Sequence, residues 1–340
     1  MNNQIGCHLK RTLIQVVIRL ALSALLVAIV LVNVRTQHLE QYITGHVGWM
    51  ILAVQPLIVL TAFLVAARMQ LLVTPPGVRF WVAFKATLLG VGLNVALPAR
   101  LSELLKPTYL HEHGSIPFSA GLAAVLVERV TDVITMGLLA LLAAGMIWEE
   151  GSLVWLFPMV GLLLALPLVS RYEQSFLQMA RLMPGKRVRE LTTFFLVELA
   201  ARLRERVLLR ALGLGTLAWA TTFAALHLVV HMVGSIEISI PQAAFLILAA
   251  SVGGAAAMLP GGFGSYEAGA ILVLQSFGYN FEEALVLAVA MHVTQLAPNV
   301  LAAVVILLRE RIGLVNLARE AREHLRRSGN HRPVSQQDLV

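Results

Sequence analysis

Long apolar runs dominate the chain and limit what it can fold into. They occupy residues 13–34, 47–67, 80–97, 118–148, 153–169, 211–233, 242–258, 268–278 and 284–308. A helix of about 20 apolar residues matches the hydrocarbon thickness of a bilayer. Charged residues make up only 13% of the chain and hydrophobic residues 58%, whereas soluble domains are about 25% charged. The sequence therefore predicts an all-α, polytopic membrane helical bundle with about eight transmembrane elements.

The charged residues lie mostly between these runs. The formal net charge is +7, but basic residues between hydrophobic segments orient membrane proteins, so we expect no nucleic-acid partner. Cys7 is the single cysteine, which excludes an internal disulfide and a multi-cysteine metal site. Lys10 and Arg11 precede the first run as in a signal peptide, but the absence of a small-x-small cleavage site favours a retained span.

Charge between the runs predicts which side of the membrane each loop faces. Arg68 and Arg79 flank one loop, and residues 171–210 contain nine Lys and Arg. Both segments and both termini are predicted to be cytoplasmic, in a multi-pass protein of the inner (plasma) membrane. The Glu149-Glu150 loop and the loop containing Glu237 are predicted to be external.

Two breaks, each containing a proline, interrupt the apolar pattern at corresponding places. The first is residues 97–103 (LPARLSE) and the second is residues 259–267 (LPGGFGSYE); both pass from Leu-Pro to Ser and Glu. Because the predicted loops before and after each break lie on opposite sides of the membrane, the chain between them must cross the membrane an odd number of times. A re-entrant hairpin followed by one crossing satisfies this, as do three full crossings. The hairpin solution predicts two inverted halves, about 10–150 and 151–310, as in inverted-repeat transporters.

We expect one transmembrane domain over residues 1–310. Residues 171–210 are predicted to be a cytoplasmic connector whose amphipathic helices lie on the membrane surface, the second of them rich in Arg202, Arg204 and Arg206. Residues 311–340 are predicted to form a basic cytoplasmic tail that is partly disordered.

Charged residues near the first break are candidates for a binding site, because charge inside a bilayer costs about 2.5–3.5 kcal/mol on insertion scales. Arg100 and Lys106 suit an anionic phosphate, and Glu103 would orient them or meet a cationic headgroup. An interfacial loop whose charges reach water is the alternative explanation.

A second charged cluster, Glu128-Arg129-x-x-Asp132, lies inside the run 118–148. Glu128 and Asp132 share one helix face, and Arg129 is spaced to pair with Asp132. This group would bind substrate or carry a proton. A structural ion pair between helices is the alternative.

The second break offers backbone rather than basic side chains. Its candidate substrate contacts are Pro260, Gly261, Gly262, Gly264 and Ser265, followed by Glu267. The glycines permit positive φ and close backbone approach. A carboxylate at Glu267 also suits the start of the next helix without any substrate.

Three histidines lie in the later runs. His227 and His231 have the i,i+4 spacing of metal ligands, and His292 lies further on, but no nearby carboxylate or HExxH motif completes a site. This favours histidines that hydrogen-bond between helices. Because no nucleophile motif or dinucleotide fingerprint occurs, we expect no catalytic residue, no metal and no cofactor.

Three ordered motifs resemble one protein family. Residues 97–107 (LPARLSELLKP), 128–132 (ERVTD) and 259–267 are similar in order and spacing to the lysylphosphatidylglycerol synthase transmembrane region family, which are flippase-like integral membrane proteins. The resemblance covers about residues 10–310 and implies a helical bundle that moves lipids between leaflets. Bifunctional members also carry a soluble aminoacyl-transferase domain. Here a short basic tail follows, so aminoacylation is not implied.

The resulting hypothesis is a non-enzymatic lipid translocase. Its substrate would be a phospholipid, an aminoacyl-lipid or an isoprenoid-type lipid, since stand-alone members of the family are also associated with isoprenoid-linked glycolipids and hopanoid-type lipids. Arg100, Lys106 and Arg129 would hold phosphate. Four carboxylates would balance charge or couple protons: Glu103, Glu128, Asp132 and Glu267.

Two alternatives to translocation stay open. One is a membrane-embedded transferase acting on a lipid phosphate, with Glu103 or Asp132 as base. The other is an accessory subunit working beside enzymes of lipid or glycolipid biosynthesis. Membrane lipids are the expected partners in each case.

Overall fold

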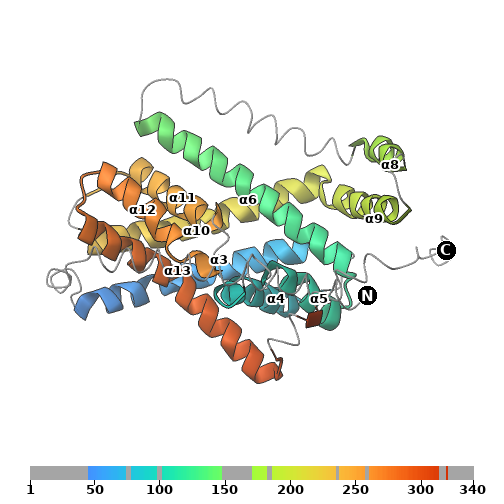
Figure 1. Ribbon diagram of the computed structural model, residues 1–340, viewed down its shortest axis with the longest axis horizontal. Coiled ribbons are helices and arrows are strands. Elements are labelled where there is room, and N and C mark those ends of the chain that lie inside the picture. The colour runs from blue at the N-terminus through green and yellow to red at the C-terminus, as the bar shows by residue number, and fades with distance from the viewer. Residues whose placement is uncertain are drawn as a thin grey trace, which may run out of the picture.

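A computed structural model describes residues 45–73, 78–97, 102–147, 171–181, 186–234, 237–256, 260–313 and 319–320. These residues form helices and no strand, which confirms the all-α bundle (Figure 1). Three helical stretches in them are long and apolar enough to cross a bilayer: Gly48–Leu72, Arg206–Val233 and Phe281–Glu310. The runs at 13–34 and 153–169, the Glu149-Glu150 loop and most of the tail lie outside the described residues.

The helices fall into two successive sets of similar make-up. The first set comprises α3 (Gly45–Leu72), α4 (Phe80–Gly92), the 3-10 turn η1 (Leu93–Val95), α5 (Leu105–Gly114) and α6 (Phe118–Ile147). The second set comprises α10 (Glu205–Val233), α11 (Ile240–Ala256), the 3-10 turn η4 (Pro260–Gly262), α12 (Ser265–Ser276) and α13 (Phe281–Glu310). Between them lie α8 (Glu173–Arg181) and α9 (Lys186–Arg202). Each set thus has a long helix, two short helices around a break, and a second long helix of 30 residues.

Contacts between the helices also repeat in the two sets. Helix α4 packs on α13 as α11 packs on α6, and the two breaks touch through η1 and η4. Helices α3 and α10 are antiparallel, because the Thr61 and Thr221 hydroxyls are 2.8 Å apart whereas Arg68, later in α3, lies against Gly215, earlier in α10. A two-fold rotation between the sets produces this exchange of partners, and the reversed helix direction makes it an inverted repeat.

The first hairpin consists of α4 and α5 and enters and leaves at one end of the bundle. Helix α4 has 13 residues and spans about 20 Å, less than the roughly 30 Å of a bilayer core. Lys85 in the first half of α4 and Tyr109 in α5 both donate to the Glu310 carboxylate, at 2.5 Å and 2.6 Å. The chain therefore returns to the end at which it entered.

The second hairpin consists of α11 and α12 and starts at the opposite end. The two helices are antiparallel and close, since a Cβ on Gly253 would overlap the Ser265 carbonyl and one on Gly269 would come within 2.6 Å of the Ala249 carbonyl. Helix α3 carries the chain across the bundle before the first hairpin, and α10 carries it back before the second. The hairpins therefore enter from opposite ends and their breaks meet inside.

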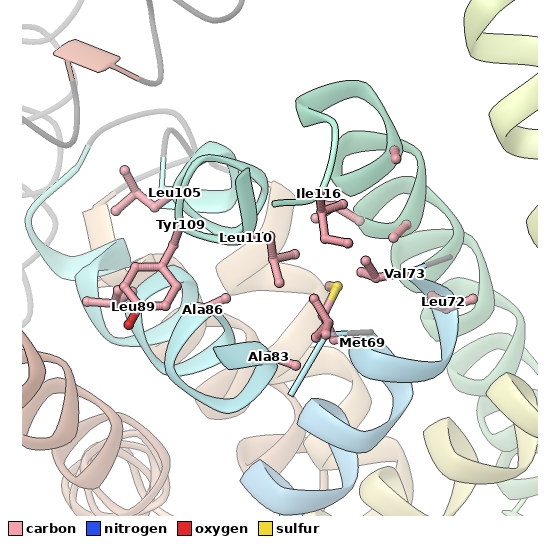
Figure 2. Packing of buried hydrophobic residues seen from close by; sticks show 14 of the residues in the cluster. Met69, Leu72, Val73, Ala83, Ala86, Leu89, Leu105, Tyr109, Leu110 and Ile116 are labelled. Atoms are coloured by element: carbon pink, nitrogen blue, oxygen red, sulfur yellow. The ribbon is translucent and has the colours of Figure 1, made fainter. Parts of the chain in front are cut away.

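Apolar packing fixes each hairpin against the long helices. Figure 2 shows the core at the first hairpin, where Met69 of α3 lies near Leu110 of α5 and Leu89 of α4 lies beside Tyr109 of α5. A second core joins α10, α11, α12 and α13 through buried side chains such as Leu226, Leu246, Leu274 and Leu287. Between membrane helices such contacts act mainly through dispersion, because lipid is as apolar as leucine.

The structure corrects three of the predicted placements. Arg68 does not flank a loop but lies inside α3, 2% exposed, because buried carboxylates neutralise it. Helix α10 begins at Glu205, inside the segment predicted as connector. Arg202, at the end of α9, is 0% exposed rather than on the surface, because α9 packs on α6.

Replacing Gly253 with alanine should destabilise the second hairpin. A Cβ there has no room beside the Ser265 carbonyl, so we expect a loss of about 1–3 kcal/mol from overpacking and a lower melting temperature in detergent. Gly213→Ala is the matched control, because a Cβ at Gly213 meets nothing within 4 Å. Alanine in place of an open helix glycine should be neutral or add up to about 1 kcal/mol. Equal melting temperatures for the two variants would contradict this packing.

Candidate functional site

Six charged side chains gather where α3, α5 and α6 meet at the end of the first break: Arg68, Glu103, Lys106, Glu128, Arg129 and Asp132. We call them the charge cluster. Arg68 Nη1 donates to Asp132 Oδ1 at 2.7 Å, and Arg68 Nη2 lies 3.6 Å from Glu128 Oε1. Lys106 Nζ donates to Glu128 Oε1 at 2.8 Å and lies 3.3 Å from Glu103 Oε2.

Arg129 joins the two charged groups predicted from the sequence. It donates to Glu128, and its guanidinium lies 3.7 Å from Glu103 and 3.4 Å from Asp132. The predicted i,i+3 pairing of Arg129 with Asp132 is therefore confirmed. Three cations face three carboxylates, so the cluster has no net formal charge.

Burial divides the charge cluster into an inner and an outer part. Lys106 and Glu128 are fully buried and Arg68 nearly so. The Arg129 and Glu103 side chains are 36% and 23% exposed. The interfacial-loop interpretation is therefore wrong for Lys106, whose ammonium is locked inside the protein.

Two glycines leave space for the inner cations. A Cβ on Gly90 would come within 2.6 Å of Lys106 Cγ, and one on Gly215 within 2.6 Å of Arg68 Nη1. Trp219 Nε1 donates to Asp132 Oδ1 at 3.2 Å, so α10 also contributes to the cluster.

The second break is built around glycines with positive φ. Gly261 and Gly262 have φ of 63° and 75°, which only glycine adopts readily. Ser265 Oγ donates to the Gly262 carbonyl at 3.0 Å. The Gly264 amide donates to Glu267 Oε2 at 2.7 Å, so the predicted helix-start role of Glu267 is confirmed.

His292 of α13 ties this break in place. Its Nδ1 lies 2.6 Å from Glu267 Oε1, and its Nε2 lies 3.0 Å from the Gly261 carbonyl. The ring stacks on Tyr266 with centroids 4.3 Å apart. For His292, the expectation of hydrogen bonds between helices is confirmed.

A cavity of about 670 Å³ lies between the two sets of helices. Glu103, Arg129 and Asp132 line one part of its wall, and Gly261, Gly262 and His292 line another. Neutral polar groups lie between them: Thr87, Asn94, Ser251, Gln295 and Asn299. The Thr87 hydroxyl is buried and has no hydrogen-bond partner within the described residues.

The structure thus sorts the predicted site residues. Glu103, Arg129, Asp132, Gly261 and Gly262 line the cavity. The others that it describes contribute to the site without lining it: Lys106, Glu128, Pro260, Gly264, Ser265 and Glu267. Arg100 lies outside the described residues. A role in binding substrate stays a prediction for all of them.

Sequence reasoning missed Arg68, Trp219 and the partner of Glu267. Charge balance is the signal that could have found Arg68, because Arg129 alone cannot neutralise both Glu128 and Asp132 inside an apolar run. His292 lies 25 positions after Glu267, a separation at which sequence spacing carries no information on contact.

The other two histidines, His227 and His231, lie outside this break. The His227 and His231 rings lie along α10 with centroids 6.4 Å apart. Over the part of the chain that the structure describes, no three His, Cys, Asp or Glu residues come together to hold a metal ion.

Comparison with protein-family models identifies the family of the chain. A family model described as the lysylphosphatidylglycerol synthase TM region matches residues 16–303. The chain belongs to this family. The match includes both hairpins and the charge cluster, and together with the apolar helices it makes the chain a multi-pass membrane protein. No individual curated protein matches the chain.

Replacing Arg68 with methionine should destabilise the protein, because Asp132 and Glu128 would lose a buried partner. Breaking a buried pair typically costs about 3–5 kcal/mol. Arg79→Met is the matched control, since Arg79 is exposed. We expect a markedly lower melting temperature in detergent for Arg68→Met and little change for Arg79→Met. Similar melting temperatures would show that Arg68 is not bound as described.

Proposed function

We propose that this family member is a lipid translocase of the inner (plasma) membrane, with both termini in the cytoplasm. The headgroup would pass through the cavity between the two hairpins. The observation that carries the proposal is that both breaks, which enter from opposite ends, border one cavity lined by charged and neutral polar groups. Polar groups inside a bilayer are costly unless paired, and such sites are typically functional.

The proposed lipid entrance is an apolar opening of the cavity between α6 and α11. Val133 of α6 and Val252 of α11 line it and are each 57% exposed on the outside of the bundle. Acyl chains can remain in the bilayer at this opening while the headgroup enters the cavity. Burying only the headgroup avoids moving the chains through protein.

The wall suits a phosphate-bearing headgroup. Arg129 offers guanidinium N–H groups for a phosphate, and Glu103 and Asp132 offer carboxylates for an amine or hydroxyls. The proposed substrate is therefore a phospholipid, an aminoacyl-lipid or an isoprenoid-type lipid. Both carboxylates are ion-paired, which favours movement of an unchanged lipid over base catalysis.

The inverted repeat supplies a mechanism of alternating access. In such folds two halves of opposite orientation exchange their arrangements around one central site, which opens it to each side in turn. The hairpins enter from opposite ends and meet at η1 and η4, so a change in their contact opens one end as it closes the other.

Reconstitution tests the proposal directly. Vesicles with a fluorescent-tailed phosphatidylglycerol, or a labelled polyprenyl phosphate lipid, would be treated with a membrane-impermeant quencher. Translocation predicts faster loss of protected fluorescence with the protein than in empty vesicles, and an unchanged lipid mass. Equal rates for both lipids would refute their translocation, and a changed mass would indicate a transferase.

Filling the cavity should slow movement without unfolding the protein. Ala255 lines the cavity, so Ala255→Trp places an indole in the proposed headgroup path. Leu272→Trp is the control, because Leu272 is 70% exposed on α12. We expect a several-fold lower translocation rate for Ala255→Trp at an unchanged melting temperature, and an unchanged rate for Leu272→Trp. Full activity of Ala255→Trp would place the path elsewhere.

A further inference from the structure

The hydrogen bonds around His292 fix where its protons lie. Nε2 faces the Gly261 carbonyl at 3.0 Å, and since a carbonyl only accepts, Nε2 must carry a hydrogen. Nδ1 faces Glu267 Oε1 at 2.6 Å, and that contact needs one hydrogen between two electronegative atoms. The pair is therefore either imidazolium with carboxylate or imidazole with carboxylic acid. In both forms Glu267 and His292 share one proton and have no net charge.

Loss of this proton changes the contact from attraction to repulsion. A lone pair on Nδ1 would then face a carboxylate anion, and the pair would carry one negative charge although Glu267 and His292 are only 7% and 6% exposed. Burying an unpaired charge is strongly unfavourable. Separation of Glu267 from His292 relieves the repulsion and weakens the attachment of the second break to α13. We call this contact the Glu267–His292 latch.

The latch is reached from the cavity. His292 lines it, and the other titratable side chains in its lining are Tyr266 of α12, Glu103 beside the first break, and Arg129 and Asp132 of α6. Tyr266 stacks on the imidazole and accepts a hydrogen bond from Gln295. The three charged groups are paired within the charge cluster. At the second break, the charge that can change is therefore the proton shared by Glu267 and His292.

We propose that Glu267 and His292 form a proton-binding site that couples lipid movement to a pH difference across the membrane. The proton holds the latch closed. It leaves as the pH of the facing compartment rises, and the released break then moves against η1 of the first hairpin. This inference rests on the proposed translocation and adds its energy source.

Glu267→Gln separates the proton from the hydrogen bonds. The glutamine amide can donate to Nδ1, its oxygen can accept from the Gly264 amide, and Nε2 can still donate to the Gly261 carbonyl. All three contacts survive and the shared proton is gone. Glu282→Gln is the matched control, the same chemical change on the first turn of α13 and away from the cavity.

The test uses the full chain in vesicles that contain fluorescent-tailed phosphatidylglycerol, with valinomycin and equal potassium on both sides to hold the membrane potential at zero. A pH difference should shift the steady-state label toward one leaflet, by up to about tenfold per pH unit for one proton per lipid, and reversing the difference should reverse the shift. Glu282→Gln should behave like the unmodified protein. Glu267→Gln, whose latch stays closed without the shared proton, should show no shift of the label in response to the pH difference.

The outcomes separate the two proposals. Lipid movement that ignores the pH difference in the unmodified protein, or an equal shift in Glu267→Gln, would overturn the proton coupling and leave translocation standing. No protein-dependent movement of the lipid would overturn both.

A second measurement examines the latch without lipid movement. Hydrogen–deuterium exchange of residues 260–267, corrected for the intrinsic pH dependence of amide exchange, should rise with pH in the unmodified protein and in Glu282→Gln. It should stay flat in Glu267→Gln. A flat profile in the unmodified protein would show that the latch does not open on losing a proton.

Discussion

The burial of Glu128 is the interaction on which the rest of the structure depends. This carboxylate is fully buried in α6, and its Oε1 atom receives Lys106 of α5, Arg129 of its own helix and, at longer range, Arg68 of α3. A buried ion costs several kcal/mol unless it is neutralised. The cations that neutralise Glu128 therefore also bind the first hairpin to two long helices. Gly90 and Gly215 are needed because a side chain at either position would overlap Lys106 or Arg68.

The two hairpins are attached by different chemistry. The first is held by several fixed ion pairs and by the bonds of Lys85 and Tyr109 to Glu310. Across from it, the second break is held to α13 by His292, which contacts Glu267 and Gly261, and by a hydrogen bond from Gln295 to Tyr266. Breaking the first set would expose several buried charges, whereas under the proposed proton coupling the loss of one proton would weaken the second. The two halves of the inverted repeat thus have the same order of helices, but their hairpins are attached to the long helices by different interactions.

Sequence patterns predicted the helices and hairpins better than they predicted the side-chain contacts between them. Apolar runs gave the helices because the bilayer fixes their length, and the two breaks gave the hairpins once the charged loops had been assigned to sides of the membrane. The helical spacing of Arg129 and Asp132 gave their pairing, since it depends only on local geometry. Arg68 was misplaced because it directly follows an apolar run, where a loop charge and a neutralised buried charge look alike. The contact of Glu267 with His292 depends on how α12 packs on α13, which no local spacing encodes.

Under the proposed function, the different attachment of the two hairpins indicates which wall of the cavity would change during transport. Glu103, Arg129 and Asp132 belong to the ion-paired attachment of the first hairpin, so we expect them to keep their positions while a headgroup is bound. Gly261 and Gly262 belong to the second break. They have positive φ angles and, as glycines, carry no side chains that would have to rearrange. Under the proposed function, Glu103, Arg129 and Asp132 would hold the headgroup while the backbone at Gly261 and Gly262 moves. A proton on His292 and Glu267 would then decide which end of the cavity is open, because it would alter the second hairpin without disturbing the ion pairs proposed to hold the headgroup.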